Sequence, residues 1–552
     1  MKKTLILVAI AVAAFSSNGL ACTNFLITGG ASTDGSVMIS YAADSHQLYG
    51  CLYSYTPKGK SGLPIRITEW DTGKYLGEIA PVHPTYSTVG NMNEHQVTIG
   101  ETTFGGRELA DSTGIMDYGS LIYITLQRAR TAREAIDIFV NLANKYGYHS
   151  EGESISIGDP NEAWLLELIG KGCKIVDGRN INKGIVWVAR RIPDGYICAH
   201  ANYPRISTFP LNDPENTLYA PDVISFAREQ GFFSGRDEDF SFKDVYAPLD
   251  FSSMRACEAR VWSFFRRFNS DMDRYVDYAM GHNPSNPFPL WIKPDRPISP
   301  KEVFDAMRDH YEGTPMDMTV DVGAGGSRSP YRWRPMVWEV DSVKYVNERA
   351  TATQQTGFWF VSQARKWLPD PVGGILWFGV DDTATSCLTP IYCSVTRTPE
   401  CLREGNGSML EYSPTSAFWF FNRVAQFAYL RYDYIGAEVR KVVDEWEKAM
   451  IAQTLTVDAS AAKLKDPRKM LTEFSSSAAQ RLFDRWTELD RYLMVKYIDG
   501  NIKKEDANGF LDNGSGRGIP AMPLQPGYSE KWKRAVVQDA GETLKVTGKL
   551  GH

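Results

Sequence analysis

Short runs rich in β-branched and aromatic residues, bounded by turn residues, recur through the first 200 positions of the chain, a pattern typical of β-strands. Residues 23–28 and 37–41 are strand-like and lie on either side of a turn rich in Gly, Ser and Asp, so they predict a β-hairpin. A second pair of strands is predicted around 86–104. Further strands are predicted at 154–157, 163–169, 185–188 and 195–199.

One helix in this region has a clear start and a clear end. Thr131 and Glu134 have the spacing of a capping box, and apolar residues follow at helical spacing as far as Ala143. Gly147 then ends the helix. Residues 22–205 therefore predict an α+β domain with antiparallel strands.

The pattern changes beyond this region. Residues from about 206 to 410 are irregular and rich in proline and aromatic residues, and the chain is predicted to be mainly helical from 411 to 552. We therefore predict a leader (1–21), a main domain with an irregular extension (22–410) and a helical C-terminal region. Two apolar stripes at helical spacing, interpreted as faces packed on a core, are Val439, Val442, Val443, Trp446 and Met450, and Leu482, Trp486, Leu489 and Leu493.

The first 21 residues have the features of a secretory signal peptide. Lys2 and Lys3 precede an apolar stretch, 5–15, that is too short to span a bilayer, and Gly19 and Ala21 are small residues at a cleavage position. No later run is long and apolar enough to predict a membrane span. We expect an exported protein, either periplasmic or extracellular.

Cleavage after Ala21 would make Cys22 the first residue of the mature chain. A lipoprotein also begins at a cysteine, but its signal usually has an aliphatic residue three positions earlier, where this chain has Gly19. We favour a free α-amine on Cys22 over a lipidated one, and both alternatives stay open from the sequence.

Composition limits the classes of function. The 552 residues are 43% hydrophobic and 23% charged with a formal net charge of -6, and no segment is basic enough to predict nucleic-acid binding. Eight cysteines are too few for a disulfide scaffold, although Cys387, Cys393 and Cys401 leave one or two disulfides open. The chain has no CxxC or HExxH motif, so we expect no metal and no other cofactor.

A cysteine at the start of a mature chain combines two parts of a catalytic site. Its thiol is a nucleophile, and its own α-amine, with a pKa of about 7.7–8.0, can accept the thiol proton near neutral pH. The chain has no G-x-S-x-G elbow, no P-loop and no G-x-G-x-x-G motif that would favour another chemistry.

Several sequence blocks follow this cysteine in a recognisable order. The first runs from Cys22 to Phe25 and through 31–36 to Asp44, and the others are 91–102, 131–135, 159–164, 187–206, 331–335 and 367–370. Together they resemble the N-terminal cysteine dipeptidases, which are N-terminal nucleophile hydrolases related to penicillin V acylases and bile salt hydrolases. The likeness covers about residues 22–400.

The resemblance implies an αββα sandwich with the nucleophile at the end of a central strand. It further implies that Cys22 attacks a peptide carbonyl to form a thioester, which water then hydrolyses. By the same likeness, Asp44 orients the cysteine amine, Asn202 stabilises the tetrahedral oxyanion, and Arg205 supports the site.

Three further residues are expected at the substrate cleft, namely Asn93, Glu101 and Tyr41. Many relatives carry an Arg-Asn-Glu-Asp run that ends at the acid, whereas Tyr41 stands at the position of that arginine here. Its absence leaves thiol activation to the amine, or to Arg205 or His46, and leaves the substrate preference open.

We therefore expect an exported cysteine-type dipeptidase that hydrolyses short peptides and meets their free amino end with acidic groups. An amidohydrolase of N-acyl amino acids or bile-acid conjugates is an alternative with the same chemistry. A lipid-anchored surface binding protein without catalysis is an alternative from another class. Whether the chain forms a homo-oligomer is also left open.

Overall fold

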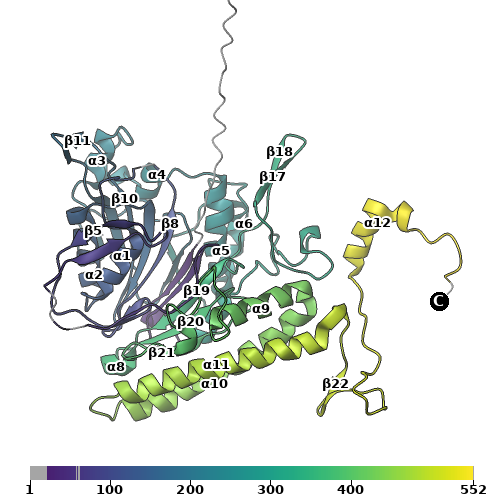
Figure 1. Cartoon of the computed structure of the whole chain (residues 1–552). Coiled ribbons are helices and arrows are strands. Elements are labelled where there is room, and N and C mark those ends of the chain that lie inside the picture. Colours follow the sequence, from purple (N-terminus) through teal and green to yellow (C-terminus); the bar gives the residue numbers. More distant parts are fainter. Residues whose placement is uncertain (1–21, 58, 60–61, 108, 551–552) are drawn as a thin grey trace, which may run out of the picture.

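The computed structural model describes residues 22–57, 59, 62–107 and 109–550. The predicted signal peptide, 1–21, lies outside the described residues. Two antiparallel sheets form the centre of the molecule (Figure 1).

The first sheet has the strand order β16 (Trp291–Ile292), β14 (Ile197–His200), β1 (Thr23–Ile27), β2 (Met38–Asp44), β19 (Thr356–Gln363), β20 (Ile375–Val380) and β21 (Thr389–Tyr392). The second has the order β15 (Thr217–Tyr219), β13 (Ile185–Arg191), β10 (Ala163–Gly170), β9 (Gly152–Gly158), β8 (Thr98–Phe104), β7 (Met92–Asn93), β6 (Thr88–Val89) and β3 (Ser54–Tyr55). Separate short hairpins are formed by β4 (Ile65–Thr68) with β5 (Tyr75–Ile79), β11 (Ile175–Val176) with β12 (Arg179–Asn180), β17 (Val337–Val340) with β18 (Val343–Val346), and β22 (Glu505–Asp506) with β23 (Gly509–Phe510).

The α-helices are α1 (Tyr118–Leu126), α2 (Ala132–Tyr146), α3 (Val223–Glu229), α4 (Phe242–Tyr246), α5 (Ala259–Phe268), α6 (Val276–Ala279), α7 (Pro300–Ala306), α8 (Asp370–Gly373), α9 (Ala417–Leu430), α10 (Tyr432–Ala461), α11 (Arg468–Tyr497) and α12 (Glu530–Leu544). Helices α1 and α2 pack on the second sheet, through β8, β9, β10 and β13. Helices α5, α7 and α9–α11 pack on the first sheet. The chain is therefore α+β, as the sequence pattern predicts.

The two sheets face each other, with β1 and β2 against β8 and β9. Leu26 lies opposite Ile39 on the inner face of the first sheet, where a Cβ on Gly158 of β9 would lie 3.0 Å from Ile39. Thr102 and Ser156 share the face of Gly158, and their hydroxyls hydrogen-bond to His200 of β14, so they form the inner face of the second sheet. Because side chains alternate along a strand, Glu101 projects from the other face of β8. The candidate site lies next to these polar contacts between the sheets.

The hairpin predicted at the start of the chain is confirmed, because β1 and β2 pair antiparallel. Thr131 caps α2 by accepting a hydrogen bond from the backbone of Glu134 at 3.2 Å. The second half of the predicted capping box differs, since the Glu134 carboxylate accepts from the backbone of Arg130 instead of Thr131.

The prediction of irregular structure between 206 and 410 is wrong for three segments. Strands β19, β20 and β21 lie there and complete the first sheet. Every residue of these strands is buried. Proline and glycine residues between them, as at 369–374, indicate a loop and explain why the sequence pattern did not predict them.

The disulfides left open by the sequence do not form, since all eight cysteines are free thiols. The Cys387 thiol faces Glu447, the Cys393 thiol donates to the carbonyl of Asp370, and the Cys401 thiol donates to the carbonyl of Ala479. The three sulfurs thus have separate partners.

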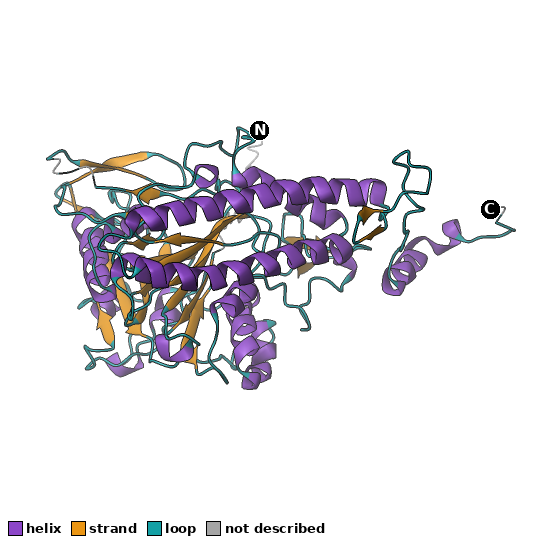
Figure 2. Cartoon of the chain, turned by 90° about the horizontal axis from the view of Figure 1, so that it is seen from below, coloured by secondary structure: helices purple, strands orange, loops and turns teal. Residues whose placement is uncertain are grey.

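The two C-terminal stripes lie on α10 and α11, which run side by side as long helices (Figure 2). The chain then extends away from the sheets through β22, β23 and α12 (Figure 1). No helix within the described ranges is long and apolar enough to cross a membrane.

A buried ion pair fastens α10 to the body of the molecule. Arg308, just after α7, lies 2.5 Å from the Glu447 carboxylate, and both side chains are almost fully buried. Arg308 also donates to the carbonyls of Thr383 and Ser386.

We expect Glu447→Ala to lower the free energy of unfolding by about 3–5 kcal/mol, because it leaves the buried Arg308 guanidinium with only the partly exposed Asp305, 3.3 Å away, as a counter-charge. Urea denaturation followed by circular dichroism measures this change. The control Glu488→Ala, on the exposed side of α11, is expected to change stability by less than about 1 kcal/mol. Equal effects of the two substitutions would contradict the structural role of the pair.

Candidate active site

The Cys22 thiol lies between the two sheets. It immediately precedes β1 and donates a hydrogen bond to the Glu101 carboxylate, on β8, over 3.3 Å. The hydroxyl of Tyr41, on β2, lies 3.8 Å from the sulfur and donates to the same carboxylate oxygen. The residue just before β1 and one residue each from β2 and β8 therefore converge on one point.

The strand register explains this convergence. Tyr41 lies opposite Asn24 on the inner face of the first sheet, and the Asn24 amide donates to the backbone carbonyl of Glu101 over 2.5 Å. Gly100 allows this close approach, since a Cβ there would lie 2.2 Å from the side-chain oxygen of Asn24. The sheets are thus tied together next to the thiol.

Arg260, on α5, holds the backbone around the cysteine. Its guanidinium donates to the carbonyl of Cys22 at 2.7 Å, to the hydroxyl of Thr23 at 2.9 Å and to the side-chain oxygen of Asn202 at 2.9 Å. The sequence reasoning missed this residue. Arg260 lies among apolar residues at the start of α5, whereas the other two arginines of this helix lie near its end, and this position is the signal that could have indicated a buried ionic role.

Asp44, at the end of β2, is fully buried beside the same cysteine. Its carboxylate lies 2.6 Å from the Arg349 guanidinium and accepts from the Thr356 hydroxyl at 2.6 Å. Burial raises the pKa of Asp44, although the positive charge of Arg349 opposes the rise. The Asp44 backbone also makes a hydrogen bond to the Cys22 side chain, so the predicted partner of the nucleophile does lie next to it.

The environment of Cys22 disfavours a thiolate. Burial, followed by the negative charges of Glu101 and Asp44, raises the pKa of this thiol well above its ordinary value. The sulfur is therefore protonated at neutral pH in the uncleaved chain, and a nucleophilic reaction requires a base to remove its proton.

Asn202 follows β14 and has a backbone φ of 60°, in the left-handed region. Its side-chain nitrogen donates to the carbonyl of Thr103 over 2.6 Å, while Arg260 holds its oxygen. Through Arg260 the amide belongs to the same hydrogen-bonded network as the Cys22 carbonyl.

Arg205 is not brought to the sulfur. Its guanidinium pairs with Glu258 at 2.9 Å and donates to the carbonyls of Ala199, Leu290 and Pro289. These contacts give Arg205 a structural role, since they join β14 to the segment just before β16.

Asn93 also has structural partners. Its amide nitrogen donates to the carbonyls of Leu126 and Ala129, and its oxygen accepts from the backbone of His95 and Val97. These bonds shape the turn before β8. Burial and the charges of Arg334 and Arg349 lower the pKa of His46, which makes no described contact with the cysteine.

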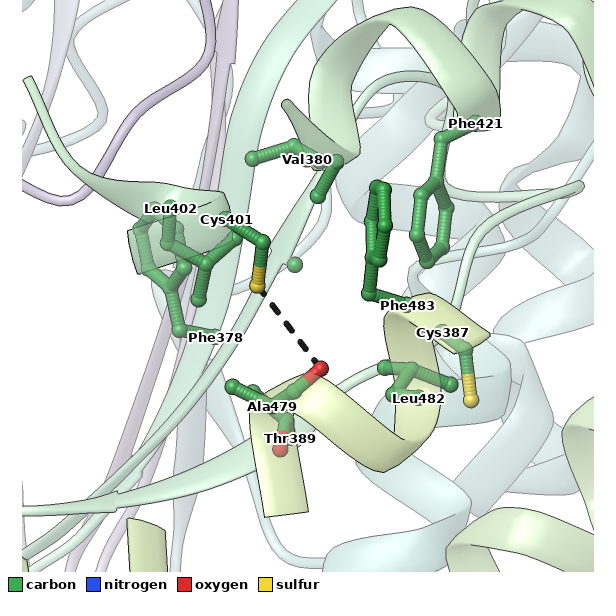
Figure 3. Close-up of a pocket in the computed structure, with 12 residues that line it drawn as sticks. Phe378, Val380, Cys387, Thr389, Cys401, Leu402, Phe421, Ala479, Leu482 and Phe483 are labelled. Carbon is green, nitrogen blue, oxygen red and sulfur yellow. Dashed lines mark hydrogen bonds between the residues drawn. The ribbon is translucent and has the colours of Figure 1, made fainter. Parts of the chain in front are cut away.

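A cavity elsewhere in the molecule is too small to hold a substrate. It lies between β20 and helices α9 and α11, with a volume of about 10 Å³, and its lining is mostly apolar (Figure 3). None of the site residues predicted from the sequence lines it.

Comparison with known proteins identifies the family of this chain. The description "Peptidase family C69" matches residues 60–445, which is well over half of the chain. The chain therefore belongs to peptidase family C69. Cys22, Tyr41 and Asp44 precede the matched residues, whereas Glu101, Asn202 and Arg260 lie within them.

Individual proteins with similar sequences carry names that are consistent with this family. A "Probable dipeptidase" of Latilactobacillus sakei is 22% identical over 502 residues, covering 86% of this chain and 95% of the relative. A "Probable dipeptidase" of Salmonella dublin is 24% identical over 393 residues, covering 68% of this chain and 81% of the relative. The "Dipeptidase A" of Lactobacillus helveticus is 23% identical over 346 residues, covering 62% of this chain and 63% of the relative.

The raised pKa of the Cys22 thiol predicts how this residue reacts with iodoacetamide in the uncleaved chain. Because only the thiolate reacts, the rate at Cys22 should keep rising above pH 9, where an ordinary cysteine with a pKa of about 8.5 is levelling off. Peptide mapping measures this rate, with the exposed Cys173 as an internal control. A rate at Cys22 that levels off below pH 8 would show that the thiol is not held protonated.

Proposed function

We propose that the protein is an exported cysteine-type dipeptidase that hydrolyses short peptides through a thioester on Cys22. The observation that carries this proposal is the Cys22 thiol, held between two sheets within hydrogen-bond distance of Glu101, in a chain of peptidase family C69. The layer order of helices and sheets, with the cysteine at the start of the inner strand β1, supports an N-terminal nucleophile hydrolase sandwich.

Removal of the leader supplies the base that the buried thiol lacks. Cleavage after Ala21 frees the α-amine of Cys22, whose pKa of about 7.7–8.0 lets it accept the thiol proton near neutral pH. Asp44, fixed by Arg349 and Thr356 and hydrogen-bonded through its backbone to the Cys22 side chain, is the group that we assign to stabilising the protonated amine.

The reaction then proceeds in two balanced steps. The sulfur attacks the peptide carbonyl carbon, the C–N bond breaks, and the leaving amine takes the proton from the Cys22 ammonium group. Water next attacks the thioester, loses a proton to the same amine and releases the first amino acid, which regenerates the thiol. The amide of Asn202, oriented by Arg260, is the group we assign to the developing oxyanion.

Export belongs to this proposal because the free amine depends on it. The leader would direct the protein to the periplasm or the extracellular space, and removal of the leader would complete the active site. A lipidated Cys22 would have no free base and would favour a surface binding protein. The intact mass of the mature protein separates the two, since an unmodified chain beginning at Cys22 supports the enzyme.

We expect Cys22→Ala to lower dipeptide hydrolysis by on the order of 10⁴-fold or more, because it removes the nucleophile. Cys22→Ser should retain only slight activity, since a hydroxyl is a poorer nucleophile at neutral pH. Release of free amino acids from a dipeptide panel measures the rate, and circular dichroism checks that the variants fold. The matched control Cys173→Ala removes an exposed thiol and should keep full activity. Full activity of a folded Cys22→Ala protein would refute the proposed nucleophile.

A further inference from the structure

Three half-buried aromatic residues form a surface beside the nucleophile. The ring of Trp70 lies 4.7 Å from that of Tyr53 and 4.9 Å from that of Tyr123, and the rings of Tyr53 and Tyr123 lie 6.1 Å apart. Each of the three residues is partly exposed. They come from separate elements, since Tyr53 just precedes β3, Trp70 lies between β4 and β5, and Tyr123 lies on α1. We call these three residues the aromatic surface.

Further rings connect the aromatic surface to the Cys22 thiol. The Tyr41 hydroxyl lies 3.8 Å from the sulfur, and the Tyr41 ring lies 5.7 Å from that of Phe358. The Phe358 ring in turn lies 6.5 Å from that of Tyr53. Cys22, Tyr41 and Phe358 are buried in one apolar cluster, and the partly exposed Tyr53 packs against that cluster. The apolar surroundings of the thiol therefore reach the molecular surface at Tyr53.

A second connection runs through Tyr118, at the start of α1. Its hydroxyl donates to Asp71, the residue after Trp70, at 2.8 Å. Burial, followed by the negative charges of Glu101 and Asp71, raises the pKa of Tyr118 well above its ordinary value. This hydroxyl therefore lies near both the carboxylate that binds the Cys22 thiol and the turn that carries Trp70. The aromatic surface thus adjoins the nucleophile along two lines of contacts.

Helix α1 fixes the position of Trp70. The Trp70 backbone donates to the Asp117 carboxylate at 2.8 Å. Gly119 leaves room for the indole, since a Cβ at this position would lie 2.6 Å from the Cβ of Trp70. Most residues of β4 and β5 are not buried. The turn of this hairpin is therefore placed by α1, the helix that also carries Tyr123.

The chemistry of this surface favours an aromatic ligand. Aromatic rings pack on one another in edge-to-face or offset arrangements, and rings that are already held in place lose little conformational freedom on binding. Both side chains of a dipeptide lie close to its single peptide bond, because each residue of an extended chain spans only about 3.5 Å. When that bond lies at the Cys22 sulfur, a side chain directed toward the aromatic surface has three rings as neighbours.

We propose that Tyr53, Trp70 and Tyr123 form a subsite for an aromatic side chain of the substrate, so that dipeptides containing such a residue are hydrolysed faster than dipeptides of small residues. This inference rests on the proposed function, because it assigns the side-chain preference of that same active site.

The first test compares substrates on the unaltered mature enzyme, so it does not depend on the folding of a variant. We expect kcat/KM for phenylalanyl-alanine or for alanyl-phenylalanine to exceed that for alanyl-alanine by about 10- to 100-fold, the effect of burying a phenyl ring. Lysyl-alanine and alanyl-lysine are included because aromatic faces also attract cations. Equal values for all five dipeptides, or a preference for lysine over phenylalanine, would overturn the inference.

The second test removes the central ring of the surface. Trp70→Ala should lower kcat/KM for the preferred phenylalanine dipeptide by about 10-fold or more and change that for alanyl-alanine by less than about 3-fold. Trp70→Phe should retain most of the preference, since it keeps an aromatic ring. The matched control Trp532→Ala, on α12 away from the sheets, should change neither value. An equal loss for both substrates in folded Trp70→Ala would show that this residue is structural only and would overturn the inference.

Gly119→Ala tests the same subsite without removing a ring. Its added Cβ displaces Trp70, so it should lower the preference for the phenylalanine dipeptide while hydrolysis of alanyl-alanine continues. Circular dichroism checks that each variant folds. An unchanged preference in Gly119→Ala together with an unchanged preference in Trp70→Ala would refute the subsite.

Binding to the Cys22→Ala protein separates failure of this inference from failure of the proposed function. Calorimetry should show about 10-fold or more tighter binding of the preferred phenylalanine dipeptide than of alanyl-alanine, with no hydrolysis of either. Hydrolysis that depends on Cys22 but shows no aromatic preference would leave the dipeptidase proposal intact and refute the subsite. Hydrolysis that survives in Cys22→Ala would refute the proposed nucleophile, whatever the binding shows.

Discussion

The hydrogen bond from the Cys22 thiol to Glu101 joins the start of β1 in one sheet to β8 in the other. Both groups are buried, and burial favours their uncharged forms. Arg260 stabilises the arrangement by binding the Cys22 backbone, and Arg349 by pairing with Asp44. The polar end of the sandwich is thus held by two buried guanidinium groups.

This arrangement links export to catalysis in the proposed mechanism. The thiol is protonated in the uncleaved chain because its nearest charged neighbours are carboxylates. A base appears at Cys22 only when the peptide bond before it is cut, since the amine formed there is the one group that the leader blocks.

Local sequence patterns predicted the elements that have a distinctive end, such as the β1–β2 hairpin with its turn rich in Gly, Ser and Asp, and the start of α2 at Thr131. They did not predict β19, β20 and β21, because these strands lie among segments rich in proline and glycine, such as 369–374, that indicate loops. Among site residues, Cys22, Tyr41, Glu101 and Asp44 do converge. Arg260 and Arg349 reach the site only through long-range packing, and Arg205 and Asn93 bind backbone carbonyls elsewhere.

Trapping the acyl-enzyme tests the central claim most directly. An alanine p-nitrophenyl ester with a free amine acylates the enzyme rapidly, so hydrolysis of the thioester becomes the rate-limiting step. The acyl-enzyme then accumulates and can be captured by acid quenching. Digestion with pepsin at acid pH keeps the α-amine of Cys22 protonated, which prevents transfer of the acyl group from sulfur to nitrogen. The account predicts that the peptide beginning at Cys22 then gains the mass of one alanyl group, attached at the Cys22 sulfur. Turnover of the ester with this peptide unmodified, or with the alanyl group on another residue, would contradict the account.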